Sequence, residues 1–320
     1  MIKIGIIGGA GYTAGELLRL LIHHPQAEIV FVNSTSNAGN KLYKVHSGLI
    51  GETEMDFTDQ LHLNAIDALF ICSAHGDSRK FLEQNAVPSS VKIIDLSTDY
   101  RDESGDFVYG LPELNKQRIQ AASKIANPGC FATVIQLGLL PLAANGLLTN
   151  EIHINAITGS TGAGVKPSSS SHFSWRNNNI SVYKAFEHQH LKEITQSIKH
   201  LQAKFDKEIV FIPVRGNFAR GIFATMYTEC NLPIEEVKAL YKEYYKDAAF
   251  TFMTEYNPDL KEVVNTNKCI VYLEKHGNKL LILSCGDNLL KGASGQAVQN
   301  MNLAFGLDEK MGLNLKNIAF

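Results

Sequence analysis

The chain opens with a short apolar run that ends in glycines and is followed at once by residues of helical periodicity. The run spans Lys3 to Ile7, the glycines include Gly8 and Gly11, and leucines recur at helical spacing over Glu16 to Ile22. A strand, a glycine turn and a helix in this order are typical of the first unit of a dinucleotide-binding α/β domain. No other feature constrains the fold of the N-terminal half as strongly.

Further apolar runs extend this pattern. Glu28 to Val32, Ala68 to Cys72 and Val91 to Leu96 predict strands with helical stretches between them, and therefore a Rossmann-like parallel sheet with helices on both faces. From about Glu151 the pattern changes to strands mixed with polar loops, which predicts an α+β domain with a mixed sheet. Its expected strands are Ile152 to Thr158, Ile209 to Val214, Phe223 to Cys230, Cys269 to Leu273 and Leu280 to Ser284. A length of 320 residues also suits two domains. The final helical pattern, Asn288 to Phe305, is expected to pack on the first domain.

The composition of the chain indicates which kinds of molecule it binds. The formal charge is −2, the isoelectric point is near 6.6 and the mean hydropathy is −0.07, so neither nucleic acid nor a membrane is an expected partner. A small-molecule substrate is expected instead. The N-terminal residues lack the apolar region and cleavage site of an export signal, which predicts a cytoplasmic protein.

The glycine turn carries Gly8, Gly11 and Ala14 as G-x-x-G-x-x-A. Small residues there let the backbone approach a pyrophosphate, and the following helix N-terminus favours its negative charge. The second strand ends in Asn33-Ser34-Thr35-Ser36, without the acidic residue that usually holds the ribose of NAD. We therefore predict NADP(H) as cofactor, with Ser34, Ser36 or Lys41 near its 2′-phosphate.

One cysteine of five has a distinctive setting. Cys130 follows Asn127-Pro128-Gly129 and precedes an apolar helical run that Pro141 is expected to end or kink. A helix start favours the thiolate form of a cysteine, which is the nucleophile. The alternative is a buried structural thiol, which is the interpretation that we prefer for Cys72 and Cys285. Beside a nicotinamide, such a thiolate indicates attack on an activated acyl group and reduction of the resulting thioester. The cysteines form no CxxC pair, and no metal is expected.

The reaction also needs an acid/base. His188-Gln189-His190, flanked by Glu187 and Glu193, offers an imidazole with an orienting carboxylate. If the segment opens a helix, positions two apart diverge, so only one of the two histidines is expected to reach Cys130. A solvated His/Glu face is the alternative reading, and His75 is a weaker candidate for the same role.

Longer motifs resemble the N-acetyl-gamma-glutamyl-phosphate reductase family nearly end to end. They are Gly8 to Leu17, Asp95 to Arg101, Tyr109 to Leu114, Ala126 to Thr133, Gly162 to Gly164, His188 to His190, Arg215-Gly216 and Asp287 to Ala297. Two segments depart from the family pattern. Val165 follows Gly-Ala-Gly where Arg is usual, and residues 188–193 read His-Gln-His-Leu-Lys-Glu where His-Arg-His-Thr-Pro-Glu is usual.

The resemblance implies a catalytic Cys130 assisted by His188 or His190, and a cofactor site that adds Tyr12, Thr13 and Asn288 to the glycines. It also implies substrate contacts from Arg101, Arg215 and Asn127, with Arg220 a further candidate or a surface ion pair. The implied domains are residues 1–147, a Rossmann domain completed by a C-terminal helix within 288–320, and 148–287, which binds substrate and mediates assembly as a homodimer or homotetramer.

The implied reaction is NADPH-dependent reduction of N-acetyl-L-glutamyl 5-phosphate to the 5-semialdehyde through a Cys130 thioester, in arginine biosynthesis. The alternatives are a reductase for another N-acylglutamyl phosphate, such as the succinyl compound, an aminoadipyl-phosphate reductase, and aspartate-semialdehyde dehydrogenase. A nucleotide-binding regulator without turnover is a rival from another class, which the intact Cys130 and histidine cluster disfavour.

Overall fold

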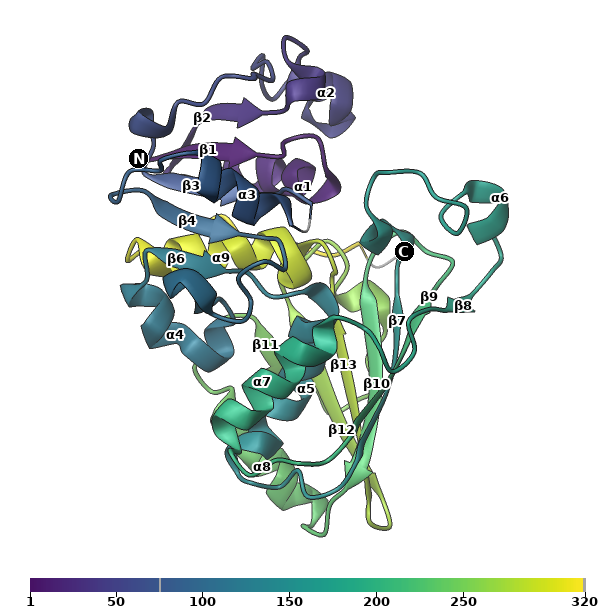
Figure 1. The fold of residues 1–320 in the computed structure, drawn as a ribbon. Helices are drawn as coiled ribbons and strands as arrows, with labels where there is room; N and C mark the ends of the chain where they lie inside the picture. Colours follow the sequence, from purple (N-terminus) through teal and green to yellow (C-terminus); the bar gives the residue numbers. More distant parts are fainter. Residues whose placement is uncertain (75, 319–320) are drawn as a thin grey trace. The chain divides into compact units, whose positions relative to one another are not determined.

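The computed structural model describes residues 1–74 and 76–318, so His75 lies outside the described residues. The chain divides into two compact units, which are described separately (Figure 1). Unit 1 comprises Met1–Pro128 and Ala293–Asn314, and unit 2 comprises Gly129–Gly292 with the described residues from Leu315. These limits differ from the domain boundaries that the sequence predicts, which are 147/148 and 287/288. Within the described residues, no helix combines the length and apolar character that a membrane crossing requires.

Unit 1 contains a six-stranded sheet in which every pairing is parallel, in the order β2-β1-β3-β4-β6-β5. The strands are β1 (Ile2–Ile7), β2 (Ala27–Asn33), β3 (Ala68–Ile71), β4 (Lys92–Asp95), β5 (Val108–Tyr109) and β6 (Lys124–Ala126). This sheet confirms the predicted Rossmann-like fold. The strand order reverses between β1 and β3, and in open parallel sheets ligands bind beyond the carboxyl ends of the strands at such a point.

The helices of unit 1 include a segment from the far end of the chain. They are α1 (Tyr12–Leu21), α2 (Leu42–Val45), α3 (Asp77–Gln84), α4 (Pro112–Ala121) and α9 (Gly295–Ala304), with short 3₁₀ helices η1 (Thr35–Asn37), η2 (Ser47–Leu49), η3 (Leu63–Ala65) and η4 (Ser104–Asp106). α9 lies against α1, α4 and β4. Ser294 Oγ donates to the carbonyl of Thr13 at 2.7 Å, and Asn300 Nδ2 donates to that of Gly110 at 2.9 Å. The last helix is therefore built into unit 1.

That last helix begins later than its sequence pattern predicts. A π-helical turn, η7 (Leu290–Ser294), precedes α9, where the sequence predicted continuous helix from Asn288. The carboxylate of Asp287 accepts the backbone N–H groups of Leu289 and Leu290, and its carbonyl accepts the N–H of Gly292. These bonds fix the wider turn because they replace those of a regular first helical turn.

Unit 2 contains the predicted mixed sheet, seven strands in the order β11-β12-β13-β10-β7-β9-β8. The strands are β7 (Ile152–Thr158), β8 (Ser181–Val182), β9 (Ile209–Arg215), β10 (Ile222–Glu229), β11 (Thr251–Met253), β12 (Cys269–His276) and β13 (Lys279–Gly286). The pairs β7–β9 and β11–β12 are parallel and the others are antiparallel. The edge strands β8 and β11 were not predicted, because two or three residues carry no readable alternation.

The helices of unit 2 are α5 (Cys130–Ala144), α6 (Phe173–Arg176), α7 (His190–Leu201) and α8 (Ile234–Tyr244), with 3₁₀ helices η5 (Ser160–Ala163) and η6 (Leu260–Glu262). α5 is buried along almost its whole length and packs against α7, α8 and the sheet. Ser284 Oγ of β13 donates to the carbonyl of Val134 at 2.7 Å. These contacts explain why the compact units divide before α5 rather than after it.

Pro141 neither ends α5 nor leaves its backbone unsatisfied. Proline lacks an N–H group, so the carbonyl of Leu137, four residues earlier, loses its usual helical donor. Tyr245 Oη donates to that carbonyl at 2.5 Å, and Tyr241 Oη donates to the carbonyl of Gly138 at 2.6 Å. Of the two outcomes predicted for Pro141, an end or a kink, the end is wrong, because α5 continues to Ala144 and Tyr245 replaces the missing donor.

Tyr245→Phe is expected to destabilise the protein by about 1–3 kcal/mol, because it leaves a buried carbonyl without its donor and preserves the ring. Urea denaturation measures the difference. Tyr227→Phe, at an exposed ring on β10, is the control and should change the free energy of unfolding by less than about 0.5 kcal/mol. Equal effects of the two substitutions would contradict this role of Tyr245.

Candidate active site

Cys130 is the first residue of α5, after an extended N-cap residue, Gly129. It is partly exposed, whereas Cys230, Cys269 and Cys285 are buried. Burial raises the pKa of Cys72 to about 12 and also raises the pKa of Cys285, so both fit the structural role predicted for them. The backbone dipoles at the N-terminus of α5 favour negative charge beside Cys130.

The backbone of Gly292 approaches Cys130 closely. A Cβ atom at position 292 would lie 2.8 Å from the Cβ of Cys130, so glycine is required there. This residue belongs to the Asp287 to Ala297 motif, and its signal in the sequence was only a glycine inside a helical pattern. The backbone of Gly292 therefore packs directly against Cys130.

His188 and His190 lie together and are both buried, with 5% and 6% of the residue exposed. Their ring centroids are 4.6 Å apart, and the ring of Phe131, next to Cys130, meets them edge-on at 5.4 and 6.3 Å. α7 begins at His190, so His188 belongs to the preceding turn and the two rings converge. The expectation that they would diverge assumed that both were helical.

The environment of His188 favours the neutral imidazole. Its Nδ1 accepts the backbone N–H of His190 at 3.3 Å, which leaves the proton on Nε2. Burial, and next the positive charges of Lys184 and Arg215, lower the pKa of His188 to about 4. At neutral pH this side chain therefore carries no charge.

His190 has a carboxylate partner. Its Nε2 lies 3.9 Å from Oε1 of Glu193, and Oε2 of the same carboxylate accepts the backbone N–H of Gly129 at 2.9 Å. Glu193 is 5% exposed, whereas Glu187 is exposed. The orienting carboxylate is thus Glu193, and it also contacts the N-cap residue of the helix that carries Cys130.

Tyr183 and Arg215 complete this group in unit 2. The Arg215 guanidinium lies over the Tyr183 ring, 4.6 Å from its centroid, and its Nη1 donates to the carbonyl of Ser160 at 3.3 Å. Burial raises the pKa of Tyr183, and Cys130 adds to this effect. Sequence reasoning missed Tyr183, whose only signal was its position at the start of the histidine segment.

Arg101 and Asn127 lie in unit 1 and are buried. Arg101 donates from Nε to the carbonyl of Asn127 at 2.9 Å and from Nη2 to that of Leu96 at 3.0 Å. The Asn127 amide donates to the carbonyl of Ala293 and accepts from Asn300, both at 3.0 Å. Both residues therefore order the carboxyl-end loops of β4 and β6, and their contact with substrate stays a prediction.

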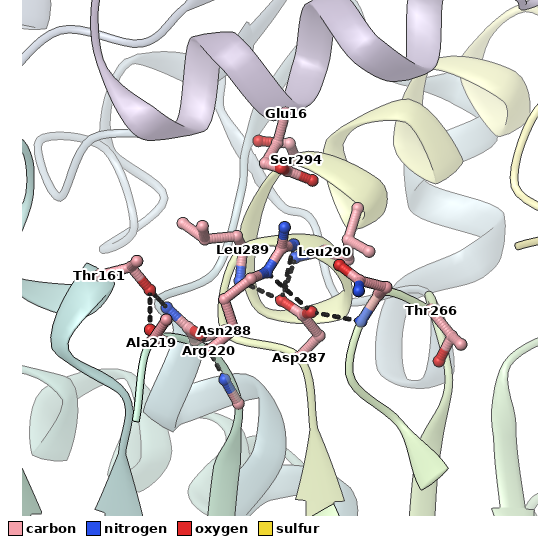
Figure 2. Close-up of polar contacts among 12 residues, drawn as sticks. Glu16, Thr161, Ala219, Arg220, Thr266, Asp287, Asn288, Leu289, Leu290 and Ser294 are labelled. Atoms are coloured by element: carbon pink, nitrogen blue, oxygen red, sulfur yellow. Dashed lines mark hydrogen bonds and ion pairs between the residues drawn. The ribbon is translucent and has the colours of Figure 1, made fainter. Parts of the chain in front are cut away.

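Arg220 and Asn288 belong to a network in unit 2 (Figure 2). Arg220 donates from Nε and Nη2 to the buried carboxylate of Asp287, both at 3.1 Å, and Asn265 N donates to the same carboxylate at 2.8 Å. Asn288 accepts the N–H of Gly221 at 2.7 Å and donates to Thr161 Oγ1 at 3.0 Å. The guanidinium of Arg220 is engaged by an internal acid, so we do not assign it to substrate.

The glycine turn of unit 1 fits a dinucleotide. Gly8 has φ +75°, and a Cβ there would lie 2.8 Å from the backbone of Cys72. Gly11 is the N-cap of α1. A Cβ atom at this position would meet nothing closer than the carbonyl oxygen of Gly8 at 3.9 Å. Tyr12, Thr13 and Ala14 form the first turn of α1. The turn follows β1 at the switch point of the sheet, where a pyrophosphate is expected.

The carboxyl end of β2 carries two serine hydroxyls. Asn37 Nδ2 lies 3.2 Å from Ser34 Oγ and 3.1 Å from Ser36 Oγ and donates to both. Lys41 is paired with Asp56 at 3.2 Å. Hydroxyl and amide groups therefore occupy the position predicted to receive a 2′-phosphate. Among the described residues, no cluster of three or more His, Cys, Asp or Glu side chains is arranged to hold a metal.

Fold and site together define a semialdehyde dehydrogenase. A family model described as "Semialdehyde dehydrogenase, NAD binding domain" matches residues 3–122, and one described as "Semialdehyde dehydrogenase, dimerisation domain" matches residues 130–288. Proteins named N-acetyl-gamma-glutamyl-phosphate reductase from Parabacteroides distasonis and Azobacteroides pseudotrichonymphae are 65% and 66% identical over the full length of both chains. The chain belongs to the N-acetyl-gamma-glutamyl-phosphate reductase family.

Solved structures share the fold at much lower identity. Aspartate semialdehyde dehydrogenase II of Vibrio cholerae, complexed with ASA, has a TM-score of 0.74 and 16% identity over 96% of this chain and 98% of its own. The aspartate semialdehyde dehydrogenase of Candida albicans, determined with NADP, has a TM-score of 0.72 and 15% identity over 95% of this chain and 98% of its own. At this identity the likeness concerns the fold.

The low pKa of His188 predicts acid sensitivity. The unfolded imidazole titrates near pH 6.5 and the folded one near 4, so stability is lost as pH falls from 6.5 towards 4. The full loss is about 3 kcal/mol, since each pKa unit corresponds to about 1.4 kcal/mol. Urea denaturation at several pH values should show a shallower pH dependence for His188→Asn than for the unsubstituted protein. His276→Asn, at an exposed site, should leave the slope unchanged.

Proposed function

We propose that this chain is an N-acetyl-gamma-glutamyl-phosphate reductase, which reduces N-acetyl-L-glutamyl 5-phosphate to N-acetyl-L-glutamate 5-semialdehyde in arginine biosynthesis. Two relatives of that name match the whole chain at 65% and 66% identity. The single structural observation that supports it best is the thiol of Cys130 at the start of α5, with a buried histidine pair and Arg215 in the same unit.

Cys130 performs the acyl transfer. Its sulfur attacks the γ-carbonyl carbon of the acyl phosphate, a C–S bond forms, and the C–O bond to phosphate breaks with release of inorganic phosphate. Bound NADPH supplies the hydride that reduces the resulting thioester. The C–S bond then breaks, and the thiol is regenerated as the semialdehyde leaves.

We assign the proton transfers to His190 rather than His188. A carboxylate beside an imidazole stabilises its protonated form, and Glu193 lies beside His190. His188 instead faces positive charges that disfavour its protonated form. His190 takes the proton of the Cys130 thiol and gives it to the oxyanion that forms when hydride adds to the thioester. When the C–S bond breaks, His190 moves that proton from the oxygen back to the sulfur, while the Nδ1 of His188 holds the backbone of His190.

Arg215 is the proposed contact for an anionic group of the substrate. It is 9% exposed and lies against Tyr183, so its guanidinium is held in one orientation. Tyr183 provides the aromatic face against which the guanidinium lies. Their position in one unit with Cys130 supports a role at the acyl group or the phosphate.

The proposed assembly is a homodimer or homotetramer in the cytoplasm, formed through unit 2. The family match described as a dimerisation domain covers residues 130–288, nearly all of this unit. Biosynthetic reductases that use NADPH draw on a cofactor of the cell interior, which supports the location.

Cys130→Ser is expected to lower NADPH oxidation with N-acetylglutamyl phosphate by at least ~10⁴-fold, because an alkoxide is not available to replace the thiolate. NADPH should still bind, as measured by fluorescence titration. Cys230→Ser, at a buried cysteine of the same unit, is the control and should retain activity. In reverse, the semialdehyde and NADP should react only when phosphate is present; reaction without phosphate would contradict the acyl-phosphate assignment.

His190→Asn is expected to lower kcat by ~10²–10⁴-fold and to remove the acidic limb of the pH profile, since general acid/base catalysis contributes this much. His188→Asn keeps an acceptor for the His190 N–H and should lower kcat less, with the limb retained. The reverse order of effects would reassign the proton carrier to His188.

Cofactor preference follows from the end of β2. Ser36→Asp places a carboxylate at an exposed position where we expect the 2′-phosphate, and repulsion should raise the KM for NADPH about 10-fold or more. The KM for NADH should change little or fall. Ser47→Asp, also exposed in unit 1, is the matched control. Equal KM changes for the two cofactors would remove Ser36 from the phosphate site.

A further inference from the structure

One stretch of unit 2, residues 165–186, exposes an unusual amount of apolar surface. Of fourteen large hydrophobic side chains that are exposed among the described residues, six lie in this stretch. They are Val165, Phe173, Trp175, Ile180, Val182 and Phe186, with 50% to 76% of each residue exposed. Exposed apolar side chains gathered in one stretch of chain make that stretch a candidate contact surface. We call residues 165–186 the apolar edge segment.

The segment includes an edge strand. β8 is the last strand of the seven-stranded sheet, and its side away from β9 pairs with no other strand of the sheet. Figure 1 shows β8 and α6 at one margin of that sheet. Edge strands usually carry charges or are covered, because their free backbone groups invite pairing with another chain. β8 consists only of Ser181 and Val182, neither of which is charged, so it offers a short apolar edge beside the exposed side chains of the segment.

The backbone of the segment is also strained. Of six non-glycine residues with positive φ among the described residues, three lie here: Asn178 at 53°, Lys184 at 45° and Phe186 at 64°. This conformation is costly for a bulky residue such as Phe186. In the single chain Phe186 is 57% exposed, so only part of its surface gains from burial.

We propose that the apolar edge segment is the surface through which two copies of this chain associate, an inference that rests on the self-association proposed above. The family match described as a dimerisation domain includes the whole segment. The segment contains no Asp or Glu, and its exposed cations are Lys166 and Lys184, so burial would desolvate few charges. A second copy is therefore the occupant that fits this surface.

This surface adjoins the candidate active site. Ser181 and Val182 of β8 pair with Arg215 and Val214 of β9, and Tyr183 N donates to the carbonyl of Pro213 at 3.1 Å. Arg176, buried within the segment, donates to the carbonyl of Arg215 at 2.9 Å. A partner seated on the segment would cover β8, which pairs with Arg215 of β9 and is followed directly by Tyr183, so assembly would also support the substrate contact.

Phe186→Asp tests the assignment without threatening the fold, because Asp adopts positive φ more readily than Phe. Light scattering after size exclusion should give at least a dimer for the unsubstituted protein and a monomer for the variant, with the dissociation constant raised ~100-fold or more. Val182→Asp should act in the same way. Phe252→Asp, on the opposite edge strand β11 at 42% exposure, is the control and should not dissociate the protein.

Trp175 reports the surface directly, since it is the only tryptophan in the chain. On dilution of the unsubstituted protein its emission should shift to longer wavelength together with dissociation, and Phe186→Asp should show the long-wavelength spectrum at every concentration. A dimer that persists in both edge variants would overturn the surface assignment alone. A monomeric unsubstituted protein would overturn self-association itself, and a short-wavelength, concentration-independent spectrum would then show that Trp175 is covered within one chain.

Discussion

The carboxylate of Glu193 is the interaction on which the candidate site depends. One oxygen accepts the backbone N–H of Gly129, and the other lies 3.9 Å from His190. The first contact fixes the entry to α5 and therefore the position of the Cys130 thiol; the second holds a histidine of α7. Because both contacts belong to one buried side chain, the N-terminus of α5 and the first residue of α7 are tied to the same group.

A nucleophile at a helix start is only as well placed as the helix itself. α5 is buried along nearly its whole length, so its irregularity at Pro141 has to be satisfied inside the protein. Tyr245 and Tyr241 supply donors to two carbonyls in the turn before Pro141. At the other side of Cys130, Asp287 fixes the turn that brings Gly292 against the thiol. The position of one sulfur atom thus depends on polar contacts distributed over three parts of unit 2.

Much of this arrangement was predictable from local pattern. The strand, glycine turn and helix at the N-terminus specify a parallel dinucleotide-binding sheet, and Pro-Gly before Cys130 places a thiol at a helix start. The choice of Glu193 over Glu187, and the pairing of Tyr183 with Arg215, were not predictable. The choice between the two glutamates depends on burial, and the pairing of Tyr183 with Arg215 joins chain segments 30 or more residues apart. Spacing along the sequence encodes neither. The short strands β5, β6, β8 and β11 were missed because their pairing comes from neighbours rather than from alternation.

The same burial explains why the charged neighbours of His188 and His190 matter. Both rings lie against Phe131 in surroundings that exclude water, where an imidazolium is costly unless a negative group faces it. His190 has that group in Glu193, whereas His188 faces Lys184 and Arg215. A substrate phosphate that enters beside Arg215 would place negative charge near His188 as well, and would weaken the repulsion that keeps it neutral.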